Sequence, residues 1–199
     1  LLIISILLSF LIVNNFDSKF LINTILISSA LYLFFVTLRD FFIKKYKNIS
    51  QNISHFGFSL LILSILFNNL FSTEIITNLK VGQTFESSKT KIVFEKINQK
   101  VEKNYKSIVG SFSVQNLNGE IDNLLPELRI YNQPNIVTSE ADIITTLLSD
   151  KFMVINVVQN QDYFNVRYQV KPFMFWIWLS VLLISLGGLM SFFKRENEK

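Results

Sequence analysis

The stretch PFMFWIWLSVLLISLGGLMSFF, residues Pro172–Phe193, decides the class of fold, because it holds no charged side chain over a length that can cross a membrane. A helix through the hydrocarbon core of a bilayer needs roughly 20 mostly apolar residues. The whole chain is 50% hydrophobic, with a mean hydropathy of +0.37, which is above the level of ordinary soluble domains. We therefore predict an integral membrane protein.

Three further apolar runs precede this stretch, so we expect about four transmembrane helices, at residues 1–13, 20–43, 52–71 and 172–193. Lys and Arg concentrate on the cytoplasmic side of such helices. Here they gather before the third run and in the tail 194–199, as Arg39, Lys44, Lys45, Lys47, Lys194, Arg195 and Lys199. The loop between the first two runs, with Asp17 and Lys19, has no such surplus. The C-terminus is therefore expected in the cytoplasm and the long segment 72–171 outside.

The segment 72–171 alternates polar and apolar residues, as strands do. Turn signals at Asn118-Gly119 and Asn160–Asp162 separate the strands, and Ser139–Ser149 is expected to form a short helix with Ser139 as its N-cap. The expected strands lie at Lys89–Ile97, Ser107–Gln115, Glu127–Tyr131, Phe152–Val158 and Tyr163–Val170. The fold class is thus an α-helical integral membrane protein with a β-rich external (periplasmic) domain, a small barrel or sandwich, between the last two helices.

Charge and cysteine content exclude several classes of function. Acidic and basic residues are equal in number between Ser72 and Lys171, so the net charge of +4 resides in the flanks of the apolar runs. That surplus indicates topology rather than a phosphate-binding surface, and we expect no nucleic-acid partner. The chain has no cysteine, which excludes disulfides, thiolate metal sites and thiol redox chemistry within it.

The single histidine, His55, lies near the start of the third apolar run. Ionisable residues inside a membrane are costly and often functional. Two interpretations stay open from the residues alone. His55 is either an interfacial side chain that bonds a neighbour or a lipid head group, or a ligand of haem iron, for which imidazole is a usual axial ligand. Gly57 is expected to leave room beside the helix for a flat ring.

Two further groups of residues border the external segment. Trp176 and Trp178 are typical of an aromatic belt at a membrane surface, and Gly187-Gly188 predicts a close helix contact. Arg167 and Lys171 are either solvated charges or a site for an anionic group of a ligand or partner. Neither a Ser/His/Asp set, a nucleotide-binding loop nor a pair of catalytic carboxylates is evident in the sequence.

Several short motifs occur in an order that resembles one known family. They are SHFGFS around His55, then LKVGQTF, LPELRIY, SEADI, DKFMV and the ending VRYQVKPFMFWIWLSVLLISLGGLMSFFKR. From about His55 onward the chain resembles the C-terminal part of the CcmF/CycK family of cytochrome c-type biogenesis proteins, the membrane haem lyases. Because the first residue is Leu1, inside an apolar run, we expect a fragment or a subunit of a split protein.

The resemblance implies a role in the last step of cytochrome c maturation, in which haem is attached to the C-x-x-C-H motif of apocytochrome c. It implies a resident haem b in the helical bundle, with His55 as an axial ligand of the haem iron and the second ligand on an earlier helix. The resident haem would pass electrons from quinol to the arriving haem. Arg167, Lys171, Trp176 and Trp178 would contact haem or a partner.

The implied partners are the other cytochrome c maturation subunits, a haem chaperone, apocytochrome c, quinol and membrane lipid. The implied location is the bacterial inner membrane, or the mitochondrial inner membrane if the gene is organellar. Three alternatives stay open: a paralogous subunit dedicated to nitrite-reductase maturation, a non-catalytic membrane-anchored assembly factor, and a transporter. The lack of buried carboxylates and of broken paired helices in the apolar runs argues against a transporter.

Overall fold

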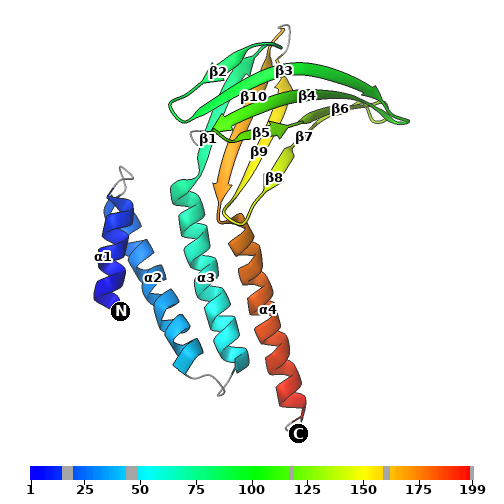
Figure 1. Ribbon diagram of the computed structural model, residues 1–199. Helices are drawn as coiled ribbons and strands as arrows, with labels where there is room; N and C mark the ends of the chain where they lie inside the picture. The colour runs from blue at the N-terminus through cyan, green and yellow to red at the C-terminus, as the bar shows by residue number, and fades with distance from the viewer. Residues whose placement is uncertain (15–19, 44–48, 117–118, 159–161, 198–199) are drawn as a thin grey trace. The chain divides into compact units, whose positions relative to one another are not determined.

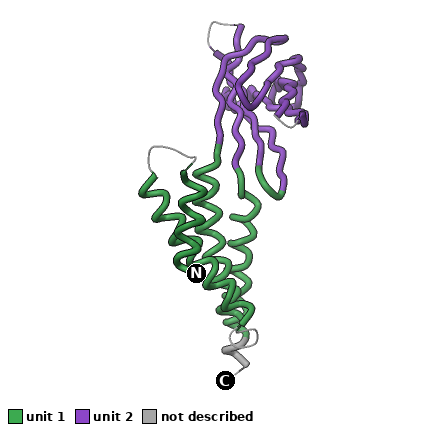
Figure 2. Tube along the Cα trace, turned by 60° about the vertical axis from the view of Figure 1, so that its left-hand side comes forward, with its two compact units in different colours: residues 1–72, 147–149, 172–199 green, residues 73–146, 150–171 purple. Residues whose placement is uncertain are grey.

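The computed structural model describes residues 1–14, 20–43, 49–116, 119–158 and 162–197. The chain forms two compact units (Figure 2). The helical unit contains residues 1–72, 147–149 and 172–199, and the β unit contains residues 73–146 and 150–171. The short piece Leu147–Ser149, which packs with the helices, thus consists of the turn residues Leu147 and Leu148 and the first residue of the strand that follows in the β unit.

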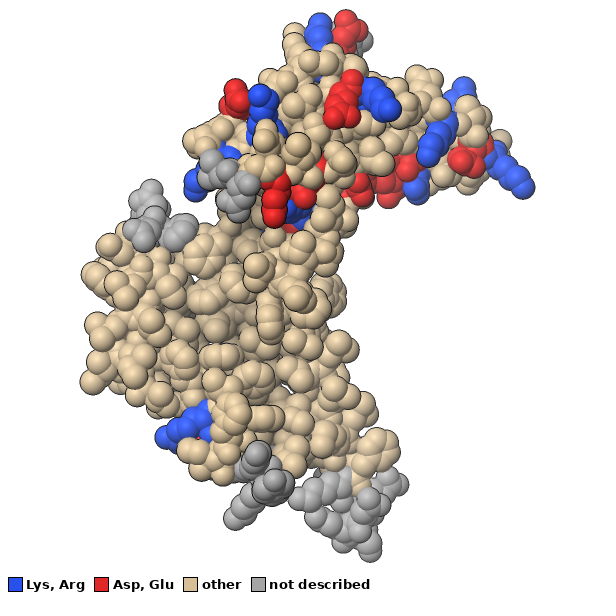
Figure 3. Space-filling view, in the orientation of Figure 1, with Lys and Arg blue, Asp and Glu red and all other residues tan. Residues whose placement is uncertain are grey.

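Within the described residues, the helical unit has four helices, which pack side by side in chain order (Figure 1). They are α1 (Leu2–Val13), α2 (Phe20–Ile43), α3 (Ile49–Phe71) and α4 (Met174–Asn197). Of these described helices, α2, α3 and α4 are long and apolar enough to cross a membrane, whereas α1 has 12 residues. Figure 3 shows charged side chains gathered on the β unit, while the helices present a broad uncharged surface in that view.

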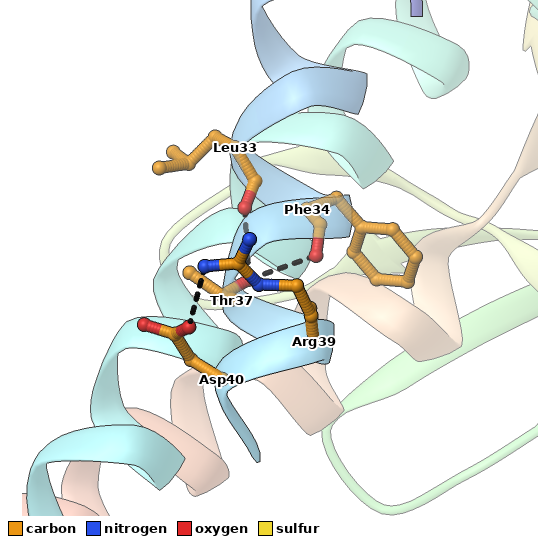
Figure 4. Close-up of polar contacts among 5 residues, drawn as sticks. All are labelled: Leu33, Phe34, Thr37, Arg39 and Asp40. Carbon is orange, nitrogen blue, oxygen red and sulfur yellow. Dashed lines mark hydrogen bonds and ion pairs between the residues drawn. The ribbon is translucent and has the colours of Figure 1, made fainter. Parts of the chain in front are cut away.

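Small and polar side chains set the spacing of the helices. Thr37 on α2 forms a hydrogen bond of 2.8 Å with Ser59 on α3, and it also donates to the carbonyl oxygens of Leu33 and Phe34 in its own helix (Figure 4). On the other side of α3, Gly57 and Gly187 bring α3 and α4 into close contact. Such small-residue contacts are typical of helices packed in membranes.

The basic residues that predict topology are largely outside the described structure. Lys44, Lys45, Lys47 and Lys199 lie there, as do Asp17 and Lys19. Arg39 lies near the end of α2, where its guanidinium pairs with Asp40 at 3.3 Å (Figure 4). The orientation of the helices in the membrane therefore stays a prediction.

The β unit is a sandwich of two sheets. Among the described residues, a four-stranded sheet has the order β1-β10-β9-β8, and a six-stranded sheet has the order β2-β3-β4-β6-β7, with β5 paired to β4. The strands are β1 (Thr73–Leu79), β2 (Thr84–Glu86), β3 (Thr90–Val101), β4 (Tyr105–Asn116), β5 (Ile121–Leu124), β6 (Glu127–Tyr131), β7 (Val137–Glu140), β8 (Asp142–Thr145), β9 (Ser149–Val157) and β10 (Phe164–Pro172).

The core of the sandwich lies between the inward faces of both sheets. Phe94 of β3 stacks on Phe112 of β4, with ring centroids 4.2 Å apart, and Phe164 of β10 meets the edge of Phe94 at 5.6 Å. Met153 and Ile155 of β9 are fully buried in the same cluster. Alternate residues on each strand supply this core, as the period of two in the sequence predicts.

Two local predictions are wrong. The expected helix at Ser139–Ser149 is absent from the described structure: the segment forms the end of β7, the whole of β8 and the turn into β9. The last helix begins at Met174 rather than at Pro172, because Pro172 ends β10 and Phe173 has a φ of +62°. That left-handed backbone separates the strand from the helix.

Candidate functional site

His55 lies on a face of α3 that neither neighbouring helix covers. The exposed residues Gln51, His55, Phe58, Ile65 and Asn69 lie three, four or seven residues apart, which is the spacing of one helix face. We call this set the uncovered stripe. The other faces of α3 are occupied, because Phe56 and Ser59 contact α2 while Ser54 and Gly57 contact α4. The His55 imidazole therefore points away from its neighbours in this unit.

The position of His55 fits the ligand chemistry of an imidazole. Among the residues that the structure describes, none forms a hydrogen bond or ion pair with its side chain, so both ring nitrogens are available to a group outside these helices. A ring nitrogen of a neutral imidazole is the usual axial ligand of haem iron. One such side chain supplies one axial ligand, and His55 is the only histidine in the sequence, so a second histidine ligand would have to come from another polypeptide segment.

Gly57 does not leave room for a flat ring, contrary to the prediction. A Cβ atom on Gly57 would lie 2.9 Å from the Cβ of Leu183 and 3.0 Å from the carbonyl oxygen of Ser180, so the backbone of α4 fills that space. The predicted glycine contact on α4 is present at Gly187 but not at Gly188, beside which a Cβ would meet nothing within 4 Å. A cofactor at His55 would therefore lie on the uncovered stripe.

Trp176 and Trp178 lie far from His55 along the helices. The contact of Gly57 with Ser180, Leu183 and Ile184 sets the antiparallel register of α3 and α4, which puts His55 roughly 10 Å along the axis from Trp178. Trp178 is 64% exposed, and the Trp176 ring meets Phe175 edge-on at 5.8 Å. Aromatic side chains of this kind at the start of a membrane helix typically lie in the interface between lipid and water.

Arg167 belongs to a polar cluster across β1 and β10. Glu74 faces Gln169 in the register of these strands, and Ile76 faces Arg167. One carboxylate oxygen of Glu74 accepts hydrogen bonds from Gln169 Nε2, at 2.6 Å, and from Arg167 Nε. The hydrogen bond from Gln169, assisted by Arg167 and the charge of Lys171, holds the pKa of Glu74 below its ordinary value. Arg167 is thus already paired, and an anionic ligand would have to compete with Glu74 for it.

Another polar contact joins the two sheets inside the sandwich. Lys151 of β9 donates a 2.6 Å hydrogen bond to Asp122 of β5, and their side chains are only 14% and 16% exposed. Asn116 also donates to Asp122, at 3.2 Å. Burial and the nearby charge of Asp122 raise the pKa of Tyr168 to about 12. Sequence reasoning missed this contact, because its members lie on separate strands and show no shared motif.

The β unit also contains an apolar cavity of about 450 Å³ that the sequence did not predict. At its polar edge, the hydroxyl of Ser139 on β7 hydrogen-bonds the side chain of Asn156 on β9. The remaining lining is aliphatic and comes from four strands: Ile108, Leu128, Ile130, Val137 and Val157. The alternation of polar and apolar residues on β4 and β6 shows which side chains face the core. It does not show which of those side chains the opposite sheet leaves uncovered, and the cavity lies at such positions.

Known proteins resemble this chain in sequence. A family model described as "CcmF C-terminal beta-sandwich" matches residues 70–172. The cytochrome c-type biogenesis protein CcmF of Pseudomonas aeruginosa is 28% identical over 146 residues, which are 73% of this chain and 22% of that protein. CcmF of Escherichia coli is 25% identical over 146 residues, 73% of this chain and 23% of that protein. The cytochrome c-type biogenesis protein ccl1 of Rhodobacter capsulatus is 32% identical over 117 residues, 59% of this chain and 18% of that protein.

The fold is also similar to that of a solved structure. The protein described as "Cytochrome c Heme Lyase CcmF" matches with a TM-score of 0.66 and 15% identity, over 94% of this chain and 33% of that one. At that identity the match shows likeness of fold. The chain spans less than a quarter of the length of the relatives that it matches in sequence.

Proposed function

The chain belongs to the CcmF family, whose C-terminal β-sandwich it contains, and from this premise we propose that it is part of the membrane haem lyase of cytochrome c maturation. The proposed reaction joins haem to the thiols of the C-x-x-C-H motif in apocytochrome c. The proposed setting is an energy-coupling inner membrane, with residues 72–171 on the outer side and residues 194–199 in the cytoplasm. Other maturation subunits, a haem chaperone, apocytochrome c and quinol are the proposed partners.

The observation that carries the proposal is the exposure of the His55 imidazole on the uncovered stripe of α3. A histidine that faced α2 or α4 would be enclosed by side chains already packed there. On the uncovered stripe its imidazole would be free to bind the iron of a b-type haem. When bound, that haem would supply electrons, drawn from quinol, to the iron of the haem to be attached.

The residues of this chain hold the ligand in place. Gly57 and Gly187 allow α3 to pack closely on α4, and Ser59 ties α3 to α2 through Thr37. A helix fixed on two sides presents His55 in one direction, which suits a ligand that sets the position of a haem. The imidazole must be neutral to bind iron.

The β unit and the start of α4 supply proposed contacts for the arriving haem or a partner protein. Lys171 forms no ion pair within the described residues, so its ammonium group can approach an anionic group directly. Arg167 would first have to release its hydrogen bond to Glu74 before it could bind such a group. Trp176 and Trp178 lie on the first turns of the helix that follows, where their rings could stack on a flat apolar ligand.

A test compares covalent haem in c-type cytochromes of cells that carry His55→Ala or Gln51→Ala. Both residues lie exposed on the uncovered stripe, one turn apart, so each variant removes a polar side chain from the same face. We expect His55→Ala to abolish mature cytochromes c while the protein still accumulates in the membrane, and Gln51→Ala to leave maturation near the wild-type level. Normal maturation in the His55→Ala cells would overturn the proposed role.

A non-catalytic assembly factor is a second candidate, and the cavity of about 450 Å³ in the β unit favours it. An aliphatic pocket with a polar edge can seat the side chains of a partner protein. An assembly role of this kind would survive His55→Ala. Substitution of a lining residue such as Ile130→Asp would abolish it, and co-purification of the maturation subunits would report the loss.

A further inference from the structure

The turn between β8 and β9 belongs to the helical unit, although its strands belong to the β unit (Figure 2). The carbonyl oxygen of Leu148 in this turn accepts a 2.9 Å hydrogen bond from the backbone N–H of Phe173. Phe173 immediately precedes α4. The turn is therefore attached to the point at which α4 begins.

That point is held firmly within the helical unit. The Phe173 ring packs against Phe67 and Phe71 at the end of α3, with centroid distances of 5.4 and 6.4 Å. Asn68 of α3 donates a 2.6 Å hydrogen bond to the carbonyl oxygen of Pro172. Because these contacts fix Phe173 against α3, they also fix the position of Leu148 along the axes of α3 and α4.

The turn presents two adjacent leucines to its surroundings. Leu147 is 62% exposed and Leu148 is 71% exposed. Turns that face water are usually built from Gly, Pro, Asn, Asp and Ser, because these residues suit tight backbone geometry and stay solvated. Charged side chains are also absent from the sequence between Asp142 and Asp150. A pair of exposed leucines in this turn therefore indicates an apolar surrounding.

The first turns of α4 indicate what that surrounding is. Phe175 is 37% exposed and Trp178 is 64% exposed, and aromatic side chains at the end of a membrane helix mark the interface between lipid and water. The turn is bonded to the residue next to this helix, so its leucines lie at the same depth. We propose that Leu147 and Leu148 insert into the lipid leaflet at this end of α4 and, with Phe175 and Trp178, form an interfacial anchor.

The lipid bilayer is the occupant that the position favours, because Leu148 is bonded to the residue that precedes α4 and the exposed aromatic side chains at the start of α4 are those of a lipid–water interface. The anchor would give the β8–β9 turn a membrane contact of its own, in addition to the spanning helices. Exposed apolar side chains hold peripheral segments in the headgroup region in the same way. It depends on neither the haem ligand nor the identity of the client protein. A second protein seated on the leucines is the competing outcome that the experiment must separate.

The chain has no cysteine, so a single introduced cysteine can carry a polarity-sensitive fluorophore. The test labels Leu147→Cys, Leu148→Cys and a control, Ile121→Cys, in the full chain reconstituted in phosphatidylcholine–phosphatidylglycerol vesicles. Ile121 on β5 is also 62% exposed, so it matches Leu147 in side-chain accessibility. Nitroxide groups placed near the top of the lipid acyl chains then quench only fluorophores that touch lipid.

We expect labels at 147 and 148 to emit at shorter wavelength and to be quenched by the nitroxide lipids at least threefold more than the label at 121. Two labelled positions guard against one substitution disturbing the turn. Equal quenching at all three positions would overturn the proposal. Emission at shorter wavelength without quenching would also overturn it, because that result means that protein rather than lipid covers the leucines.

Discussion

A Cβ atom on Gly187 of α4 would lie 2.6 Å from the carbonyl oxygen of Ser50 on α3. Real Cβ atoms do not approach a backbone oxygen so closely, and a backbone oxygen cannot rotate away as a side chain can. Glycine at 187 is therefore what allows the two helices to pack at this distance. The same contact holds the stretch of α3 that carries His55.

We predict that Gly187→Ala weakens the packing of α3 on α4, whereas Gly188→Ala does not. Both variants add one methyl group, but a Cβ at position 188 would meet nothing within 4 Å. Overpacking of this kind typically costs about 1–3 kcal/mol. Thermal unfolding of the detergent-purified protein should show a lower midpoint for Gly187→Ala alone. Equal midpoints for the two variants would contradict the helix contact described here.

Lys151→Met should destabilise the sandwich strongly. The change leaves the partly buried carboxylate of Asp122 without its cationic partner. The loss of about 3–5 kcal/mol known for fully buried pairs is an upper bound here, because Asp122 keeps its hydrogen bond from Asn116. The double variant Asp122→Asn/Lys151→Met should recover most of the loss, because asparagine has no charge and can still accept from Asn116. A double-mutant cycle on unfolding free energies measures the coupling, and simple additivity would show that the ion pair adds nothing.

Glu74 should make the stability of the β unit depend on pH. Its pKa lies below the ordinary value of 4.5 in the folded protein, so its contribution is present above pH 4.5 and is lost as the pH falls through the lowered value. Glu74→Gln should therefore reduce the unfolding midpoint at pH 7, and the difference from wild type should shrink toward pH 3.

The control for Glu74 is a change in its partner. Arg167→Gln made in the Glu74→Gln background should cause little further loss at pH 7, because the ion pair is already gone. If the gap between wild type and Glu74→Gln stayed constant from pH 7 to pH 3, ionisation of Glu74 would not be the source of the stabilisation.

Hydropathy predicts the helices well because a helix that crosses a bilayer needs about 20 mostly apolar residues in a row. The sequence predicts a helix at 20–43, and α2 runs from Phe20 to Ile43. Helix ends depend on local contacts that hydropathy does not contain. α3 begins at Ile49 instead of residue 52, and α4 begins only after Phe173, whose conformation depends on Leu148, Phe67 and Phe71.

The segment Ser139–Ser149 shows why local signals fail in a sandwich. Ser139 resembles a helix N-cap, but it pairs with Leu128 across β6 and β7, and Ile143 pairs with Phe152 across β8 and β9. These partners lie 11 and 9 residues away along the chain, outside the helical turn that an N-cap signal describes, and the sheet pairing overrides the local preference. The strand β1 was missed for a related reason: its partner β10 follows it by about ninety residues, and together they hold the Glu74–Arg167 pair.

The sequence identifies His55 as a candidate because the chain has one histidine, but it cannot tell which face of α3 is covered. Polar residues such as Asn52, Ser54 and Ser59 lie around that helix besides His55, so polarity does not mark one face. Only the packing of Gly57 and Ser59 against different neighbours shows that His55 is left exposed. The prediction of space beside Gly57 was wrong because the sequence does not show which helix packs there. A glycine in a membrane helix signals close approach, but the approaching group here is α4.

The central claim is that His55 is an axial ligand of a b-type haem, and the reduced-minus-oxidised absorption spectrum tests it most directly. The protein would be purified from its own membranes with its associated subunits, as wild type, His55→Ala and the stripe control Gln51→Ala. We predict a b-type signal in wild type and Gln51→Ala that is lost or shifted in His55→Ala, with equal protein recovery. An unchanged haem spectrum in His55→Ala would contradict the claim and leave His55 as an ordinary side chain at the membrane interface.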